Sequence, residues 1–268
     1  MEEGMYLEQI NGPEDKFVFD VSHQSYTHKM LTGRKEAFMD EAHYGDVSGF
    51  TNPKESKHDF FNIGHTSTSI SLACGLAKAR DLKNEKYNVI ALIGDGSLSG
   101  GEAYEGLNQA AYEGTNMIII VNDNEMSIAE NYGGLYKNLR TLRETEGKAE
   151  CNFFKAMGFE YHYVKDGHDY KELIDTFNQV KDSDHPVVVH IHTIKGKGYT
   201  PAELHKEAWH WGMPFEISTG ETKFKGNGES YNALTGKYLL EKMAKDPKVA
   251  AITAGTPTVM GFTADKRM

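Results

Sequence analysis

Two short polar motifs carry the residue types that could bind a divalent cation together with a phosphate group. Asp95 lies in a Gly-Asp-Gly turn, and Asn124 closes an Asn-Asp-Asn turn 29 residues later. Carboxylate and amide oxygens are hard ligands that suit Mg²⁺, which shares its octahedral coordination with substrate phosphates. The glycines beside Asp95 let the backbone approach a phosphate closely. Either motif alone is an ordinary turn, but the pair at this spacing predicts a magnesium and phosphate site.

The elements that must position these motifs follow a regular order of strands and helices. Apolar runs rich in β-branched and aromatic residues predict buried strands at residues 17–21, 88–93, 117–121 and 187–191. Helical patterns lie between them, at residues 68–82, 101–112 and 169–182. Strands that alternate with helices indicate βαβ units. We therefore predict an α/β fold of three layers, in which helices cover both faces of a mainly parallel sheet.

Asp95 and Asn124 each lie just beyond the carboxyl end of one of these strands. Ligands of open parallel sheets bind at that edge. Two neighbouring strands would therefore deliver the carboxylate and the amide oxygen to the same place. The helix predicted at residues 101–112 would offer the free N–H groups of its first turn to a bound anion.

The last part of the chain reads as a linker followed by the start of a second domain. Residues 216–228 are polar and contain glycine, whereas residues 229–245 are helix-like and residues 248–253 are strand-like. A helix and one strand cannot bury their own faces. We therefore expect a first domain at residues 1–215, a linker at 216–228, and the opening of a second domain at 229–268.

The composition of the 268 residues excludes several classes of protein. A net charge of −10 leaves no basic surplus for a nucleic-acid backbone. The amino terminus lacks the pattern of a secretory signal, and no apolar run is long enough for a membrane helix. Cys74 and Cys151 are too few for a disulfide framework, so we interpret them as buried, inert thiols. These features favour a cytoplasmic protein with no membrane or nucleic-acid partner.

Longer runs around the two motifs resemble the 1-deoxy-D-xylulose-5-phosphate synthase family. The runs are VFDVSHQSYTHKMLTGR (18–34), SGFTNPKESKHD (48–59), GHTSTSIS (64–71), GDGSLSGGEAYEGLN (94–108), NDNEMSIAENYGGL (122–135) and KGKGYTPAE (195–203). The likeness extends almost continuously from residue 16 to about residue 215, and the Asp95 and Asn124 motifs together resemble the thiamine-diphosphate motif of transketolase-like enzymes. The resemblance implies the three-layer α/β fold that binds thiamine diphosphate, with thiamine diphosphate and magnesium as cofactors.

The resemblance also implies roles for individual residues. Magnesium would be held by Asp95, Asn124 and the backbone carbonyl of Met126. The thiamine diphosphate would be bound by His23, Gly64, His65, Thr66, Gly96, Ser97, Asn124 and Tyr199. Catalytic roles would fall to His23 and to His210, the latter near the substrate. Imidazoles suit such a site because they donate to phosphate oxygens and move protons near neutral pH.

The family's reaction gives the expected activity. Its members are homodimers that join pyruvate to D-glyceraldehyde 3-phosphate with loss of carbon dioxide, and the product feeds isoprenoid, thiamine and pyridoxal synthesis. Two other functions stay open on the sequence: another transketolase-like enzyme, and a truncated paralogue that binds cofactor without chemistry. The HQSYTHK and GHTSTSIS runs favour the synthase over other transketolase-like enzymes.

The sequence departs from the family at two places. A stretch that contains an active-site Gly-Gly-His motif is expected between Asp15 and Lys16, and the pyrimidine-binding glutamate and the third domain are expected beyond Met268. We therefore expect a partial chain, in which these residues alone bind the cofactor without turnover.

Other polar residues have open or structural interpretations. His162, His190 and His192 alternate with apolar residues in strand-like runs, which favours packing or a local hydrogen bond over catalysis. Residues for which a ligand contact and a structural role stay equally open are His28, His58, His168, Lys195 and Lys197.

Overall fold

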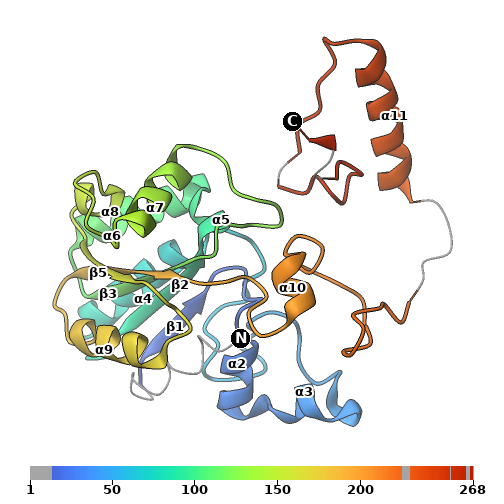
Figure 1. Ribbon diagram of the computed structural model, residues 1–268. Helices are drawn as coiled ribbons and strands as arrows, with labels where there is room; N and C mark the ends of the chain where they lie inside the picture. The colour runs from blue at the N-terminus through green and yellow to red at the C-terminus, as the bar shows by residue number, and fades with distance from the viewer. Residues whose placement is uncertain (1–13, 225–229, 254, 264–265, 268) are drawn as a thin grey trace. The chain divides into compact units, whose positions relative to one another are not determined.

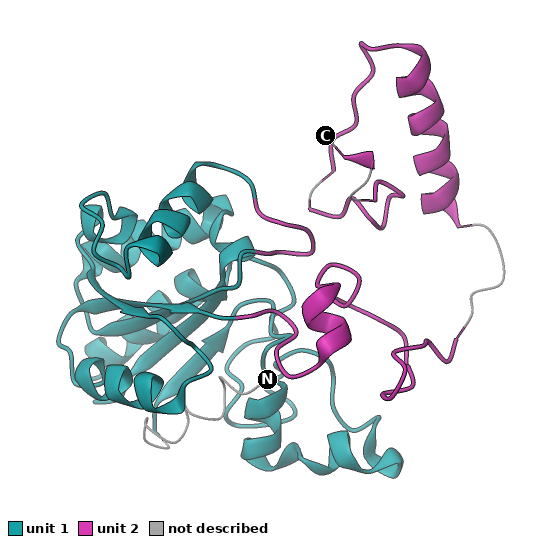
Figure 2. Cartoon of the chain, viewed as in Figure 1, with its two compact units in different colours: residues 1–125, 132–193 teal, residues 126–131, 194–268 magenta. Residues whose placement is uncertain are grey.

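The structure, a computed structural model, describes residues 14–224, 230–253, 255–263 and 266–267. It divides into two compact units (Figure 2). Unit 1 comprises Met1–Glu125 and Tyr132–Thr193, and unit 2 comprises Met126–Asn131 and Ile194–Met268. The start of the first domain predicted at residues 1–215 and the predicted linker at 216–228 lie partly outside the described residues.

Unit 1 is built on one five-stranded sheet. Its strands are β1 (Lys16–Phe19), β2 (Val89–Gly94), β3 (Met117–Asp123), β4 (Glu160–Val164) and β5 (Pro186–His192). They run in the order β1-β2-β3-β5-β4, and every neighbouring pair is parallel. The three central strands are nearly continuous runs of buried aliphatic residues, as expected for a parallel sheet covered on both sides.

Helices cover both faces of this sheet, which confirms the predicted three-layer α/β fold (Figure 1). Alternate residues of β2 point to opposite cores: Val89, Ala91 and Ile93 join one, and Ile90 and Leu92 join the other. The first core is completed by α4 (Ser69–Leu82), α6 (Gly101–Glu113), α7 (Gly134–Glu144) and α8 (Phe153–Ala156). The second is completed by α9 (Tyr170–Val180).

Short helical elements lie between β1 and α4, and one follows β2. They are α2 (Tyr26–Lys29), the π-helix η1 (Met30–Arg34), α3 (Glu36–Met39), the 3-10 helix η2 (Glu41–His43) and α5 (Asp95–Leu98). At Thr32 and Gly33 the backbone of η1 leaves helical geometry, Gly33 having a φ of 92°. This turn redirects the chain between α2 and α3.

Unit 2 contains two α-helices among its described residues, α10 (Thr200–Leu204) and α11 (Tyr231–Lys245). The helix predicted at residues 229–245 is thus found, but the strand predicted at 248–253 is wrong, because these residues form turns and irregular backbone. A strand is stable only when its N–H and C=O groups pair with a neighbour. The described part of unit 2 offers only isolated bridges, Met126 with Glu130 and Phe215 with Thr222.

The thiol prediction is correct for one cysteine and wrong for the other. Cys74 is buried on α4, and burial raises the pKa of its thiol to about 11. Cys151 is exposed. It lies in the loop just before α8, where Asn152 caps the helix and takes the buried position instead. Within the described residues, no helix is both long and apolar enough to cross a membrane.

Candidate functional site

The strand register brings Asp95 and Asn124 to one edge of the sheet. Gly94, the last residue of β2, is paired with Asn122 near the end of β3. Asp95 follows as the first residue of α5 and is buried, and Asn124 follows β3 and is partly buried. A carboxylate and an amide oxygen therefore lie beyond the carboxyl ends of adjacent parallel strands, where ligands of such sheets bind.

Asp20, at the end of β1, is a further buried carboxylate of this edge. Its backbone N–H continues the ladder to Leu92 O at 2.8 Å. Its two carboxylate oxygens accept hydrogen bonds from the backbone N–H groups of Ser67 and Ser69, at 2.9 and 3.0 Å. Asp20 thus fastens the loop that precedes α4 to the end of β1. Asp20 was not among the predicted site residues, although it follows an apolar strand just as Asp95 does.

Further hydrogen bonds join the loops that carry the predicted cofactor residues. Ser67 Oγ donates to Ser97 O at 2.7 Å, and Ser22 Oγ donates to Ile63 O at 3.1 Å. A Cβ at Gly100 would collide with the side chain of Ser67, so only glycine permits this approach. These contacts hold three segments at the same edge of unit 1, at residues 20–23, 63–69 and 95–100, the last of which begins with α5.

The predicted ligand-binding residues of these loops face solvent or lie half-buried. His23, Gly64, His65 and Thr66 are exposed, and Gly96 and Ser97 are partly buried. A side chain at Gly94 would meet nothing within 4 Å, so open space adjoins the turn before Asp95. The structure therefore brings the predicted residues of unit 1 together around an accessible edge.

Three other predicted residues, Met126, Tyr199 and His210, belong to unit 2. Tyr199 donates from its hydroxyl to Ile217 O at 2.9 Å, and its ring packs edge-on against Trp209. His210 is exposed, and its Nδ1 lies 2.9 Å from the ammonium of Lys195.

The lysines and histidines whose roles the sequence leaves undecided differ in environment. Lys195 also donates to the carbonyl of Ser127, whereas Lys197 is exposed. His58 and His168 are partly buried in loops.

His28 is part of a buried ionic cluster in unit 1. Its Nε2 lies 3.1 Å from Asp59 Oδ1, and Arg34 binds both oxygens of that carboxylate at 2.7 and 2.9 Å. The fully buried ammonium of Lys29 pairs with Glu55 at 2.7 Å. Burial opposes ionisation of Asp59, but the bonds from His28 and Arg34 outweigh it and hold the pKa well below its usual range. These contacts favour a bracing role for His28.

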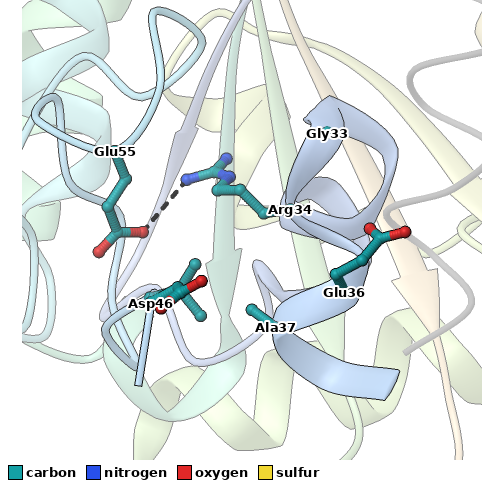
Figure 3. Close-up of a pocket in the computed structure, with 7 residues that line it drawn as sticks. Gly33, Arg34, Glu36, Ala37, Asp46 and Glu55 are labelled. Carbon is teal, nitrogen blue, oxygen red and sulfur yellow. Dashed lines mark hydrogen bonds and ion pairs between the residues drawn. The ribbon is translucent and has the colours of Figure 1, made fainter. Parts of the chain in front are cut away.

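A small pocket of about 170 Å³ adjoins this cluster (Figure 3). It is lined by Gly33, Arg34, Glu36, Ala37, Asp46, Val47 and Glu55. None of these seven residues is among the predicted cofactor or metal residues. The Arg34–Glu55 ion pair that spans it, at 3.4 Å, is the edge of the buried cluster rather than a separate site.

The residues present at the sheet edge fit a magnesium ion. In the described part of the chain, no group of three or more His, Cys, Asp or Glu side chains is arranged to hold a metal. A cation here would therefore take its remaining ligands from amide, backbone, phosphate or water oxygens. That mixed, oxygen-only set is the one that Mg²⁺ prefers, and Asp95 and Asn124 have side chains of the type that could supply its protein part.

Comparisons with known proteins identify the family of the chain. A sequence profile described as 1-deoxy-D-xylulose-5-phosphate synthase matches residues 6–151 and 142–193. The chain belongs to the 1-deoxy-D-xylulose-5-phosphate synthase family. The resemblance found in the sequence is thereby confirmed.

Individual relatives of the synthase family match most of the chain. The 1-deoxy-D-xylulose-5-phosphate synthase of Alkaliphilus oremlandii is 42% identical over 94% of this chain and 46% of its own length. That of Listeria monocytogenes is 43% identical over 92% of this chain and 42% of its own length. The chain thus spans about half the length of the curated relatives it matches, in keeping with the expected partial chain.

Solved structures show the same fold at low sequence identity. The transketolase of Campylobacter jejuni superposes with a TM-score of 0.56 at 22% identity, covering 76% of this chain and 32% of its own. The transketolase of Leishmania mexicana gives 0.52 at 18% identity, covering 72% and 29%. These matches support the fold alone, which is transketolase-like.

Proposed function

We propose that this chain provides the diphosphate- and magnesium-binding part of a 1-deoxy-D-xylulose-5-phosphate synthase. The enzyme would join pyruvate to D-glyceraldehyde 3-phosphate with loss of carbon dioxide, and the product would feed isoprenoid, thiamine and pyridoxal synthesis. The observation that carries the proposal is the β2–β3 register, which places Asp95 and Asn124 at one edge. Membership of the family supports the reaction class.

Each part of the predicted site has a task in this proposal. Asp95 and Asn124, with the carbonyl of Met126, would hold Mg²⁺, and the Gly96–Ser97 turn would meet the diphosphate. The exposed loop at residues 64–66 and the side chains of His23 and Tyr199 would bind and orient the cofactor. His23 and His210 would hold or move protons, because a neutral imidazole can accept one near pH 7. Bound thiamine diphosphate would supply the electron sink for decarboxylation and carbon–carbon bond formation.

The metal assignment can be tested at Asp95. We expect Asp95→Ala to abolish Mg²⁺-dependent binding of thiamine diphosphate in titration calorimetry, because the carboxylate is the charged protein ligand. Asp175→Ala is the matched control, since Asp175 is an exposed carboxylate on α9 that pairs with Lys171. Unchanged affinity in a folded Asp95→Ala protein would exclude this carboxylate as a ligand.

Turnover is a separate proposal, because the chain covers only 46% of its Alkaliphilus relative. We expect a polypeptide of these 268 residues to bind the cofactor and to release no product from the two substrates. An orienting acid and a substrate pocket supplied elsewhere would be missing, and loss of a positioned acid alone costs a factor of about 10²–10⁴. Chromatographic detection of 1-deoxy-D-xylulose 5-phosphate at rates near those of a full-length relative would contradict this.

We also propose that the protein is a homodimer and that it is located in the cytoplasm.

A further inference from the structure

The middle residue of the Asn-Asp-Asn motif is more deeply buried than its two neighbours. Asp123 is fully buried, whereas its neighbours Asn122 and Asn124 are only partly buried. Asp123 is the last residue of β3 and its side chain lies inside unit 1, whereas Asn124 is the first residue after the strand. Asn122 is itself held, because its Oδ1 accepts a hydrogen bond from Thr193 at 2.6 Å.

The Asp123 carboxylate gathers contacts from three parts of unit 1. Its Oδ2 lies 2.9 Å from Nε2 of His190 on β5 and pairs with the guanidinium of Arg143 on α7. Its Oδ1 accepts the backbone N–H of Glu125 at 3.1 Å. Arg143 also binds Glu125 Oε2 at 3.0 Å. Both residues that flank Asn124 are therefore fixed by one network.

The protonation states in this network are set by its geometry. A carboxylate can only accept, so Nε2 of His190 must carry the hydrogen, and Nδ1 is then free to accept from Tyr161, whose hydroxyl lies 2.8 Å away. Burial raises the pKa of Tyr161, and burial also lowers the pKa of His190 despite the carboxylate beside it. The neutral imidazole of His190 on β5 therefore joins Tyr161 on β4 to Asp123 on β3 through two hydrogen bonds.

We propose that Asp123, His190 and Arg143 are positioning residues for the bound cation, acting through the backbone of residues 123–125 on Asn124. The inference rests on the proposed magnesium site. Mg²⁺ demands near-ideal octahedral geometry, whereas Ca²⁺ tolerates irregular coordination. Contacts that fix the position of Asn124 should therefore affect Mg²⁺-dependent affinity more than Ca²⁺-dependent affinity.

The test compares the two cations in the same variants of this chain. Titration calorimetry gives the affinity for thiamine diphosphate with Mg²⁺ and with Ca²⁺. We expect His190→Leu to weaken Mg²⁺-dependent binding about 10–100-fold, the usual effect of removing a residue that orients a metal ligand, and to weaken Ca²⁺-dependent binding less. His190→Gln, whose amide can still donate to Asp123, should restore part of the preference for Mg²⁺.

Val180→Ala is the control for a general loss of stability. Val180 is the last residue of α9, is buried in the opposite core, and is not part of the network. It should lower the melting temperature without changing the ratio of the two affinities. If His190→Leu does not fold, Arg143→Met carries the same expectation, because it removes the other cross-element contact to Asp123.

The outcomes separate this inference from the proposed function. Wild-type protein that binds no thiamine diphosphate with either cation would overturn both. Wild-type binding, together with network variants whose Mg²⁺ to Ca²⁺ ratio matches that of Val180→Ala, would overturn the positioning role alone. A lowered ratio with partial recovery in His190→Gln supports it.

Discussion

Asp59 shows how a single buried carboxylate makes stability depend on pH. Its folded-state pKa lies well below the ordinary value of 3.8, since bonds from His28 and Arg34 outweigh the effect of burial. An unfolded chain therefore takes up this proton first as the pH falls. The stabilisation is fully present above about pH 4 and is lost progressively below it.

We predict that the free energy of unfolding falls more steeply between pH 5 and pH 3 in the wild type than in Asp59→Asn. The difference should approach one proton per molecule, measured by urea denaturation at several pH values. Asp175→Asn, on the exposed surface of α9, is the control and should keep the wild-type slope. Equal slopes for wild type and Asp59→Asn would refute the proposed ionisation.

For individual residues, the sequence predicts which polar side chains follow a strand better than it predicts which distant residues those side chains contact. Asp95 and Asn124 could be found because an apolar run precedes each. The roles of Asp20 and His190 depend on contacts 47 and 67 residues away, with Ser67 and Asp123. No local pattern encodes such a pairing, so these roles required the three-dimensional structure.

Two glycines on the helices of one face have opposite relations to their surroundings. A Cβ at Gly106 on α6 would lie 3.0 Å from Ile70 and from the backbone of Ser71 on α4. A Cβ at Gly75 on α4 would meet nothing within 4 Å. The first glycine allows α4 and α6 to approach, and the second only weakens its helix.

We predict opposite effects for the same substitution at these positions. Gly106→Ala should destabilise the fold by about 1–3 kcal/mol through overpacking. Gly75→Ala should stabilise it by roughly 0.4–1 kcal/mol, because alanine restricts the unfolded chain and favours a helix. Thermal or urea denaturation measures both, and a Gly106→Ala protein as stable as the wild type would contradict the close packing.

Helices and strands with a strong apolar pattern can be predicted from the sequence. Those whose structure depends on pairing with a neighbouring strand are harder to predict. The central strands are found within two residues of their predicted ends. β4, with the sequence EYHYV, was not among the predicted buried strands, although the run around His162 is strand-like; it is partly exposed and pairs with β5 alone. Helix α7 was missed although Leu135, Leu139 and Leu142 mark one face, a signal that was present in the sequence.

For the whole molecule, the exposed apolar surface of unit 2 predicts association. Trp211, Ile217 and Tyr231 are between 74% and 89% exposed, and surface of this kind usually meets a partner. We expect a homodimer in multi-angle light scattering at micromolar concentration. Tyr231→Ser should weaken it, whereas Tyr112→Ser, at an exposed tyrosine of unit 1, should not. A monodisperse monomer would argue against this prediction.

The strand order has a consequence for the synthesis of the chain. β5 is made last, yet it inserts between β3 and β4. A nascent chain that has passed Asp123 but has not reached Pro186 exposes one edge of β3, with the sequence MIIIV, and leaves β4 without a neighbour. Open apolar edges of this kind invite aggregation. Emergence of β5 from the ribosome is therefore the step that closes unit 1, and chaperone protection matters most just before it.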